Sequence, residues 1–219
     1  MAAYDAVIFD MDGTLVDTER AVLEAWEAAA LKFGFVFSRD IMMTTVGTTN
    51  GDTIEIMRRK YPDAPHDEIR KDMSVIFQAV RESGKIVLRP GAREALETVS
   101  GLGLRIGLCT STRRASAETT LASLGIRHFF DAVVCGDEVE RGKPDPQPYL
   151  LAAERLGVDP RRCFVVEDTP SGSRSALSAG MTVAVVPDLV AVADDVAERA
   201  AAVFDNIMQA VSLLKTTNS

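Results

Sequence analysis

Short apolar runs and longer amphipathic stretches follow one another along most of the chain. The runs are apolar throughout instead of alternating with polar residues, which is typical of strands covered on both faces of a sheet. The expected strands are 5–10, 105–109, 132–135, 163–167, 182–186 and 201–204, and the expected helices are 91–101, 113–124, 146–156 and 171–179. Since strands that alternate with helices are joined by right-handed crossovers, this order predicts an α/β fold with a doubly wound parallel sheet.

One interval, 16–86, contains no convincing strand. Its first part, ERAVLEAWEAAALKFG, has apolar residues at helical intervals, and those expected near one face are Val22, Trp26, Ala30 and Phe33. Further helical runs follow at 52–60 and 66–83. This part of the chain is therefore expected to be helical.

The length of this interval predicts a second domain, because a structureless loop of about seventy residues is uncommon inside a compact domain. We expect an inserted all-helical domain at 16–86 and an α/β core domain formed by 1–15 together with 87–219. The segment LRPG at 88–91 is expected to lead the chain back into the core. The polar tail LLKTTNS at 213–219 is expected to fray.

The charge of the chain argues against one class of partner. With a formal net charge of −8, nucleic acid is not an expected ligand, because such binding depends on Lys and Arg that neutralise phosphates. A small anionic ligand remains compatible if local cations meet it. No apolar run approaches a membrane span, and the start MAAYDAVIFD lacks a basic segment followed by a long apolar one, so no membrane partner is expected. We expect a cytoplasmic monomer.

The cysteines indicate no metal or redox chemistry. Cys109, Cys135 and Cys163 are widely spaced, lie in or at the end of apolar runs and form no CxxC pair, and the chain has only 2 histidines. They are expected to be reduced, buried thiols instead of a nucleophile or a zinc site.

Two aspartates follow the first expected strand, Asp10 and Asp12 in the stretch FDMDGTLVDTE. Ligands of open α/β sheets bind beyond the carboxyl ends of the strands, and alternate side chains of an extended chain point the same way. Both carboxylates are therefore expected to face one pocket. A calcium-binding loop starting at Asp10 would need Gly and Glu where this chain has Leu15 and Ala21. A turn or a helix cap explains one aspartate but not both.

Polar residues also follow three later strands. The hydroxyl residues 110–112 (TST) precede a helix, where they could bind phosphate, although Ser and Thr are also common helix caps. Lys143 lies in GKPDPQPY, and a lysine before such a turn is most often solvated. Glu167 and Asp168 follow CFVV, and carboxylates beside a core are costly unless they bind a cation or take part in catalysis.

Together, these segments resemble the four motifs of the haloacid dehalogenase (HAD) superfamily. The motifs are DMDGT, an apolar strand ending at Thr110, Lys143 in GKPDP, and the acidic pair in VVEDTPSG. Each motif is modest alone, and the four in this order are highly specific. With its early helical insert, the chain is similar to the subgroup that contains β-phosphoglucomutase and small sugar-phosphate phosphatases. The resemblance implies a Rossmann-like HAD core with an all-helical cap domain.

The resemblance also implies roles for the residues that match the motifs. Asp10 would be the nucleophile that becomes an aspartyl phosphate, and Asp12 would be the general acid and base. Thr110, with Ser111 beside it, would bind a phosphoryl oxygen of the substrate. Lys143 would offset the negative charge of the nucleophile and of the transferring group.

A Mg²⁺ ion is the cofactor that the resemblance implies. It would be held by the carboxylates of Asp10 and Asp168 and by the backbone carbonyl of Asp12, with Glu167 assisting directly or through water. The chemistry agrees, because a carboxylate that attacks a phosphate is repelled by it unless a cation and a lysine neutralise the site. Oxygen ligands suit Mg²⁺ better than zinc.

The insert departs from the pattern of β-phosphoglucomutases. Val22 stands where those mutases carry a histidine, and Asn50 stands about where they carry an arginine. Those two residues help to couple cap closure to the substrate, so their absence favours hydrolysis over transfer to a second sugar hydroxyl. The presence of Asp12 argues against a true dehalogenase, because a leaving alkoxide needs a proton and a leaving halide does not.

The expected function is a Mg²⁺-dependent phosphatase of small phosphorylated metabolites, either sugar phosphates or phosphoglycolate-like acids. A phosphomutase and a catalytically inert binding protein of the same fold are the alternatives. Thr48, Thr49 and Asn50 are expected to face the substrate, with Arg58 and Arg59 as further candidates. A polar loop and a solvated helix face explain these residues equally well.

Overall fold

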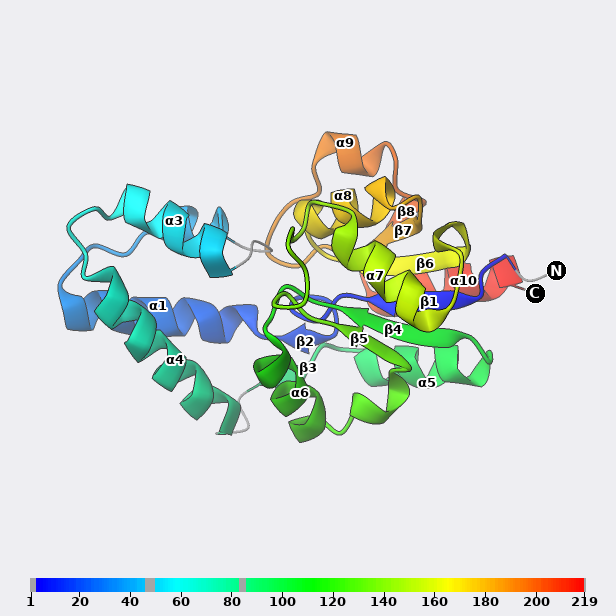
Figure 1. Cartoon of the computed structure of the whole chain (residues 1–219), viewed down its shortest axis with the longest axis horizontal. Helices are drawn as coiled ribbons and strands as arrows, with labels where there is room; N and C mark the ends of the chain where they lie inside the picture. The colour runs from blue at the N-terminus through cyan, green and yellow to red at the C-terminus, as the bar shows by residue number, and fades with distance from the viewer. Residues whose placement is uncertain (1–2, 46–49, 83–85, 219) are drawn as a thin grey trace.

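A six-stranded parallel sheet with strand order β5-β4-β1-β6-β7-β8 lies at the centre of the computed structural model, which describes residues 3–45, 50–82 and 86–218 (Figure 1). The strands are β1 (Ala6–Phe9), β4 (Arg105–Cys109), β5 (Ala132–Val134), β6 (Cys163–Glu167), β7 (Thr182–Val185) and β8 (Ala202–Val203). Every neighbouring pair in this sheet is parallel. The predicted α/β fold with a doubly wound parallel sheet is confirmed.

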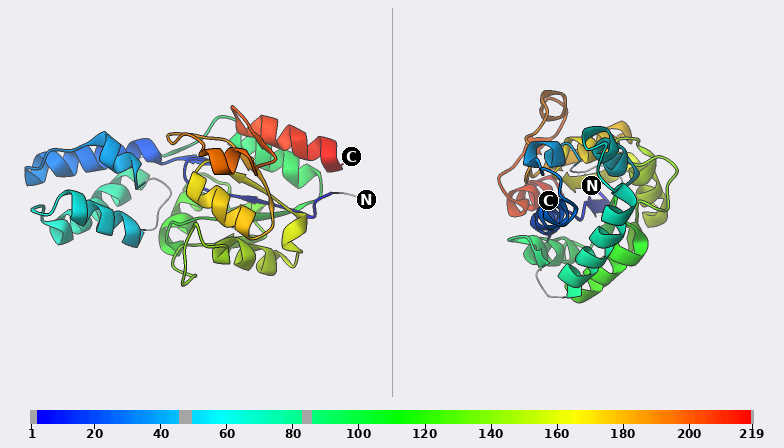
Figure 2. Two further views of the ribbon diagram at one scale, coloured as in Figure 1. Left: turned by 90° about the horizontal axis from the view of Figure 1, so that it is seen from above. Right: turned by 90° about the vertical axis from the view of Figure 1, so that its left-hand side faces the viewer.

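Helices cover both faces of the sheet (Figure 2). One face carries α5 (Ala92–Gly101), α6 (Arg114–Ser123) and α10 (Ile207–Asn218), and the other carries α7 (Gln147–Leu156), α8 (Pro170–Ser178) and α9 (Asp194–Ala197). Among the described residues, no helix is long and apolar enough to cross a membrane.

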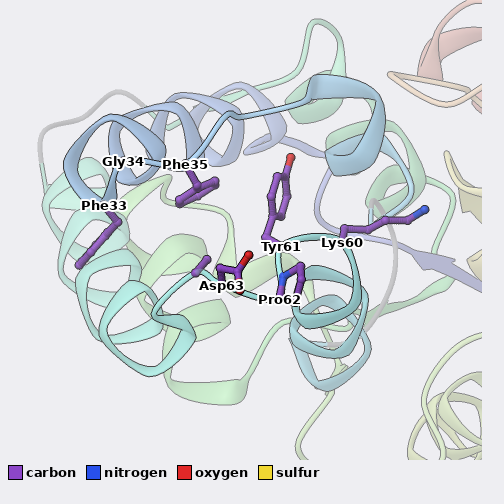
Figure 3. A pocket seen from close by; sticks show the side chains of 8 residues that line it. Phe33, Gly34, Phe35, Lys60, Tyr61, Pro62 and Asp63 are labelled. Atoms are coloured by element: carbon purple, nitrogen blue, oxygen red, sulfur yellow. The ribbon is translucent and has the colours of Figure 1, made fainter.

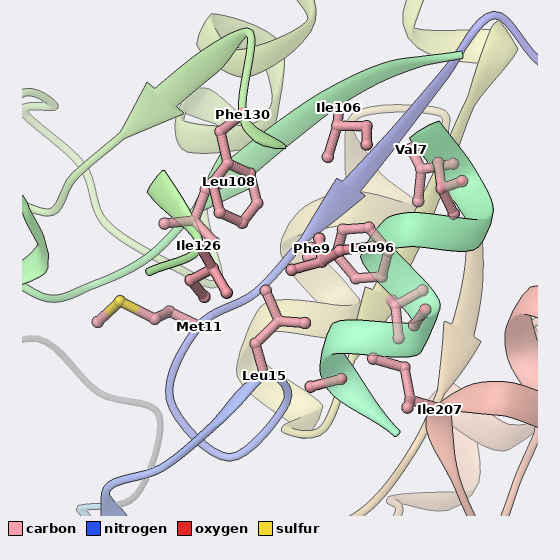
Figure 4. Packing of buried hydrophobic residues seen from close by; sticks show 14 of the residues in the cluster. Val7, Phe9, Met11, Leu15, Leu96, Ile106, Leu108, Ile126, Phe130 and Ile207 are labelled. Carbon is pink, nitrogen blue, oxygen red and sulfur yellow. The ribbon is translucent and has the colours of Figure 1, made fainter. Parts of the chain in front are cut away.

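The central strand β1 is buried on both faces. Val7 and Phe9 belong to the apolar cluster on the α5 side, and Figure 4 shows them near Leu96 of that helix. Ala6 and Ile8 belong to the cluster on the α7 side. All four β1 side chains have no exposed area, because both faces of this parallel strand are covered. An uninterrupted apolar run is what such a strand requires.

Between residues 19 and 82 the structure describes four helices, at the end of the molecule opposite to the two termini (Figure 1). They are α1 (Glu19–Phe33), α2 (Arg39–Met43), α3 (Asn50–Lys60) and α4 (His66–Glu82). We call residues 19–82 the helical segment. The chain enters it through β2 (Val16–Asp17) and leaves it through β3 (Val87–Leu88), and these two short strands pair with each other in antiparallel orientation.

The helical segment has its own apolar clusters. In one of them α1 packs on α4, and its buried members are Ala25, Ala29, Ile69 and Met73. Trp26 and Phe33 pack against this cluster and Ala30 is buried, as the predicted helical face requires. The side chain of Val22 lies outside the described part of α1. Helix α2 was not predicted, because its five residues are too few to show a helical period.

A loop that follows a strand of the main sheet also contacts the helical segment. Leu189, in the loop after β7, packs against a second apolar cluster of the segment, whose buried members are Leu23, Met42 and Met57. The neighbouring Asp188 forms a salt bridge with Arg89, which directly follows β3. The helical segment is thus attached to the sheet by its two connecting strands and by this loop.

The prediction that the tail 213–219 frays is wrong for the described residues, since α10 continues to Asn218. Leu214 is fully buried in the cluster on the α5 side. The Tyr4 N–H donates to Asn218 Oδ1 at 2.9 Å, and Asn218 Nδ2 donates to the Tyr4 carbonyl oxygen at 3.1 Å. Burial of one apolar face and this paired contact hold a tail whose composition alone looks polar.

Candidate active site

The carboxyl ends of β4, β1 and β6 lie side by side, and polar residues follow each strand there. Backbone hydrogen bonds extend the sheet by one residue, since the Asp10 N–H donates to Val166 O at 3.0 Å and the Thr110 N–H donates to Val134 O at 2.9 Å. The structure therefore brings the predicted residues Asp10, Thr110, Glu167 and Asp168 to one edge of the sheet. Each is at most 6% exposed.

Lys143 reaches this edge from the loop between β5 and α7. Its Nζ donates to Asp10 Oδ1 at 2.6 Å, to Glu167 Oε1 at 2.6 Å and to the Cys109 carbonyl oxygen at 3.0 Å. The residue is 5% exposed, so the common solvated role of a lysine before a proline does not apply. All three ammonium hydrogens have an acceptor, which fixes the cation against the Asp10 carboxylate.

Burial and charge act on these groups in opposite directions. Burial alone would lower the pKa of Lys143, but Asp10 and Glu167 raise that pKa well above its usual value. Burial raises the pKa of Asp10, Glu167 and Asp12 add to that effect, and Lys143 opposes it. The cluster contains more carboxylates than cations, so the side chains of the site carry an excess of negative charge.

Asp12 is held by hydroxyl groups instead of a cation. Its Oδ2 accepts from Thr110 Oγ1 at 3.1 Å and from Thr112 Oγ1 at 2.8 Å, and its Oδ1 accepts from Thr18 Oγ1 at 2.7 Å. Thr112 belongs to the hydroxyl run 110–112 that was predicted as a candidate phosphate site, but its contact with Asp12 was not expected. Thr18, directly before α1, was given no role, because its place ahead of a helix sets it apart in no other way.

Glu167 is engaged on both of its oxygens. Oε1 accepts from Lys143 Nζ and, at 2.9 Å, from the Tyr149 hydroxyl. Oε2 accepts from the N–H of Asp168, the N–H of Thr169 and the Thr169 hydroxyl, at 3.0 to 3.1 Å. These five donors occupy the acceptor capacity of a carboxylate, which favours a role for Glu167 as a partner of Lys143 over direct metal binding.

Asp168 lies against the turn that follows β1. Its Oδ1 accepts from Thr14 Oγ1 at 3.0 Å. Gly13 has a φ of +87°, and a Cβ at this position would lie 2.2 Å from Asp168 Oδ2, so only glycine leaves room for this carboxylate. The turn therefore brings Asp10, the Asp12 backbone and Asp168 to the same edge of the sheet.

The residues present fit a Mg²⁺ ion by the chemistry of their donors. Asp10 and Asp168 supply carboxylate oxygens and Asp12 a backbone carbonyl, which are the hard ligands that Mg²⁺ prefers. Among the described residues, no three His, Cys, Asp or Glu side chains form a ready group for a metal. The expected set of Mg²⁺ ligands needs only the carboxylates of Asp10 and Asp168. Glu167 instead accepts hydrogen bonds from other groups.

The backbone after β4 approaches the loop after β5 closely. The Gly136 N–H donates to the Thr112 carbonyl oxygen at 3.0 Å. A Cβ on Gly136 would lie 2.1 Å from the carbonyl oxygen of Ser111. Ser111 is half-buried in this loop, next to Thr110, so its predicted place near the phosphate site stays a prediction.

The prediction that residues of the insert face the substrate falls largely outside the described part of the chain. Thr48 and Thr49 lie outside the described residues, and Asn50 begins α3 with a side chain that is not described. Arg58 and Arg59 are exposed on α3, and Arg58 forms a 3.4 Å salt bridge with Asp67.

A hollow at the junction of α1, α3 and α4 is lined by Phe33, Phe35 and Tyr61, among others (Figure 3). None of the predicted site residues lines it. It therefore gives no support to a substrate contact from this part of the helical segment.

The three cysteines are free and buried, as predicted. Burial raises the pKa of Cys109, Cys135 and Cys163 to about 12 in each case. Thiols with such pKa values stay protonated at neutral pH and are poor nucleophiles.

Known proteins match both the sequence and the fold. The family model for haloacid dehalogenase-like hydrolases matches residues 4–180. The phosphorylated carbohydrates phosphatase of Thermotoga maritima is 37% identical over 183 residues, which cover 81% of this chain and 82% of that protein. The fructose-1-phosphate phosphatase YqaB of Escherichia coli is 34% identical, over 81% of this chain and 94% of that protein. The crystal structure of CbbY from Rhodobacter sphaeroides with phosphate superposes with a TM-score of 0.78 at 27% identity, covering 94% and 95% of the two chains.

A parallel sheet with an acidic cluster and one buried lysine at its carboxyl edge defines a doubly wound α/β protein whose polar site lies where such sheets bind their ligands. The chain belongs to the haloacid dehalogenase-like hydrolases, because the family model covers most of its length. The superfamily expected from the four motifs is thus confirmed. Phosphatases among the relatives also confirm the expected class of enzyme, a phosphatase of this superfamily.

Proposed function

We propose that the protein is a Mg²⁺-dependent phosphatase that hydrolyses small phosphorylated carbohydrates through an aspartyl phosphate on Asp10. The observation that carries this proposal is the contact of the buried Lys143 ammonium with both Asp10 and Glu167, beside an Asp12 held by hydroxyl groups. Lys143 thereby fixes the Asp10 carboxylate, whereas the hydroxyl groups that hold Asp12 can exchange hydrogen-bond partners. The named substrates of the two phosphatase relatives support the substrate class.

In the proposed reaction, an Asp10 oxygen attacks phosphorus and the bond to the leaving alkoxide breaks, while Asp12 gives that oxygen a proton. Asp12 then removes a proton from the water that attacks phosphorus, and the bond between phosphorus and the Asp10 oxygen breaks, which releases inorganic phosphate and restores the Asp10 carboxylate. Thr110 now donates to Asp12, and we propose that a phosphoryl oxygen takes over this hydroxyl when the substrate binds, which releases Asp12 for proton transfer. Lys143 stabilises negative charge on Asp10 and on the transferring group.

Asp10, Asp168 and the Asp12 carbonyl would hold the Mg²⁺ ion. When bound, the ion supplies the positive charge that these carboxylates and the substrate phosphate lack among the protein's own groups. Glu167 is proposed to act through Lys143, since its two oxygens already accept five hydrogen bonds.

We further propose that residues 16–86 form a cap domain over a core of 1–15 and 87–219. The Thr18 hydroxyl joins the start of the helical segment to Asp12, so a movement of the segment would change the contacts of the proposed acid and base. Closure of such a cap would limit the access of water to the site. The absence of the mutase His at Val22 and Arg at Asn50 supports hydrolysis over transfer to a second sugar.

A phosphate-release assay tests the proposal. We expect release from p-nitrophenyl phosphate, fructose 1-phosphate and glucose 6-phosphate with Mg²⁺, and none in excess EDTA. The matched control is Asp10→Asn. Undiminished release in EDTA would contradict the metal assignment. Glucose 1-phosphate, assayed with and without a sugar bisphosphate primer, distinguishes the mutase, and primer-dependent isomerisation faster than phosphate release would overturn the phosphatase.

A further inference from the structure

Tyr149 lies directly behind the proposed active site. It is on the first turn of α7, close in sequence to Lys143, and has no exposed area. Its hydroxyl donates to Glu167 Oε1 at 2.9 Å, and its ring centroid lies 5.0 Å from Lys143 Nζ. One side chain therefore contacts both members of the buried Lys143–Glu167 pair.

The position of the Lys143 ammonium depends on this contact. Glu167 Oε1 accepts from Lys143 on one side and from Tyr149 on the other, while Oε2 is held by the backbone at the start of α8. A carboxylate fixed at both oxygens gives the ammonium one defined acceptor, and the aromatic face adds an attraction for the cation. The remaining ammonium hydrogens then point at Asp10 and at the Cys109 carbonyl.

Packing alone does not require the hydroxyl. Tyr149 belongs to the apolar cluster on the α7 side, which a phenylalanine would fill equally well. A buried hydroxyl needs a hydrogen-bond partner, and this one finds it on the carboxylate that holds the proposed catalytic lysine.

We propose that Tyr149 is a positioning residue, whose hydroxyl and ring hold Glu167 and Lys143 so that the ammonium stays on Asp10. The proposal rests on the proposed function, because the aligned cation matters only if Asp10 attacks phosphorus. Tyr149 touches no reacting atom. Its loss should therefore slow the chemical steps and leave the binding of the substrate nearly unchanged.

Tyr149→Phe is the test, because it removes the hydroxyl and keeps the ring. We expect kcat for p-nitrophenyl phosphate to fall about tenfold while KM changes less than about twofold. Tyr61→Phe is the matched control, since the Tyr61 hydroxyl also has a partner, the Ser38 N–H at 2.8 Å, but lies in the helical segment (Figure 3). It should leave both constants within about twofold of the wild type.

A double-mutant cycle distinguishes positioning from general stability. In a Glu167→Gln background, Tyr149→Phe should lower kcat by less than about twofold, because the group through which it acts is already changed. The melting temperature is followed for each variant. An unchanged kcat in Tyr149→Phe, a change confined to KM, or the same fold-loss in both backgrounds would overturn the proposal.

A crystal structure of Tyr149→Phe tests the proposal without a kinetic assay. We expect Lys143 Nζ to move away from Asp10 Oδ1, from which it now lies 2.6 Å. An unmoved ammonium would overturn the positioning role even if the wild type proved to have no phosphatase activity. Absence of phosphate release by the wild type, together with a displaced lysine in the variant, would refute the proposed function alone.

Discussion

Asp10 and Asp12 are close in sequence, yet different kinds of partners hold them. Asp10 accepts from a buried ammonium, whereas Asp12 accepts from the hydroxyls of Thr18, Thr110 and Thr112. The ammonium offsets the charge of the carboxylate that is proposed as the nucleophile, whereas the hydroxyls leave the proposed acid and base with partners that can exchange when a substrate binds. The contacts thus support different proposed roles for two identical side chains.

Asp10→Asn and Asp12→Asn should fail in different ways. Asp10→Asn should form no phosphoryl adduct, because the nucleophile is gone. Asp12→Asn should slow turnover of glucose 6-phosphate by about 10²–10⁴-fold, and that of p-nitrophenyl phosphate less, because its leaving group needs no proton. Intact-mass spectrometry after acid quenching measures the adduct. A stable adduct on Asp10→Asn would place the nucleophile elsewhere.

Gly136 should tolerate no side chain. In Gly136→Ala the new methyl group would meet the Ser111 carbonyl oxygen at 2.1 Å, and a backbone atom cannot rotate away. We expect the free energy of unfolding to fall by about 1–3 kcal/mol and kcat to fall with it, because the loop that carries Thr110 must shift. Gly101→Ala is the control, since a methyl group at that position would enter open space. Equal urea midpoints for the two variants would show that the loop has room.

The sequence predicts which residues gather at this site better than it predicts their contacts. Asp10, Thr110 and Asp168 follow neighbouring parallel strands, so topology alone brings them together. Glu167 contacts Lys143, whereas Asp168 lies against the turn after β1. This difference depends on how a single turn orients two adjacent carboxylates, and no pattern along the chain predicts that orientation. Thr18 was missed for the same reason, because its partner is set by the path of the chain into α1.

At the scale of elements, the loop after β7 contacts the helical segment. Leu189 packs on an apolar cluster of that segment, and Asp188 is paired with Arg89 beside the exit strand β3. The loop thus contacts the segment at a point separate from its two connecting strands. We expect it to influence how the segment is held.

Leu189→Asp should loosen the helical segment. A charge placed against an apolar cluster loses its hydration at a large cost, so the contact should be lost while the sheet stays folded. Trp26, the only tryptophan in the chain, packs against the same cluster, and its fluorescence should move to longer wavelength. Proteolysis of the segment should become faster. Leu150→Asp, at a position 42% exposed on α7, is the control, and matching spectra and cleavage rates would contradict the role of the loop.

Elements differ in how well the sequence predicts them. The strands of the main sheet were all found, because uninterrupted apolar runs are a strong signal for buried parallel strands. The strands β2 and β3 were missed, since each has only two residues. Each forms only by pairing with the other, which lies far away in the sequence. The tail 213–219 was wrongly predicted to fray, because Asn218 at the end of α10 is held by Tyr4 from the far end of the chain.

At the scale of the whole molecule, the two short strands that connect the helical segment to the rest of the chain lie side by side. Asp17 of β2 lies directly opposite Val87 of β3, so the chain leaves and re-enters the core at paired positions. A two-residue turn is enough to join such positions in an antiparallel pair. The proposed division into a core and a cap domain can therefore be tested by removing the insert.

Replacement of residues 18–86 by Asn-Gly should leave a folded core. Leu189 is changed to Ser in the same variant, because its apolar partners are removed. We expect cooperative thermal unfolding and a circular dichroism spectrum with less helix. Hydrolysis of p-nitrophenyl phosphate should fall by at least about 10²-fold, because Asp12 loses Thr18 and the site is open to water. Loss of cooperative unfolding would contradict the proposed domain division.

The pairing of Asp17 with Val87 also affects how genes of related proteins can recombine. Two crossover points in a gene, at the codons for these residues, would transplant an entire helical insert between relatives without displacing Asp10 or Lys143. The two junctions lie about one strand spacing apart, roughly 5 Å, so inserts of different length and shape can share them. In the proposed enzyme, exchange of this one continuous stretch of DNA is expected to change the preference for a phosphorylated compound, while Asp10 and Lys143 are retained.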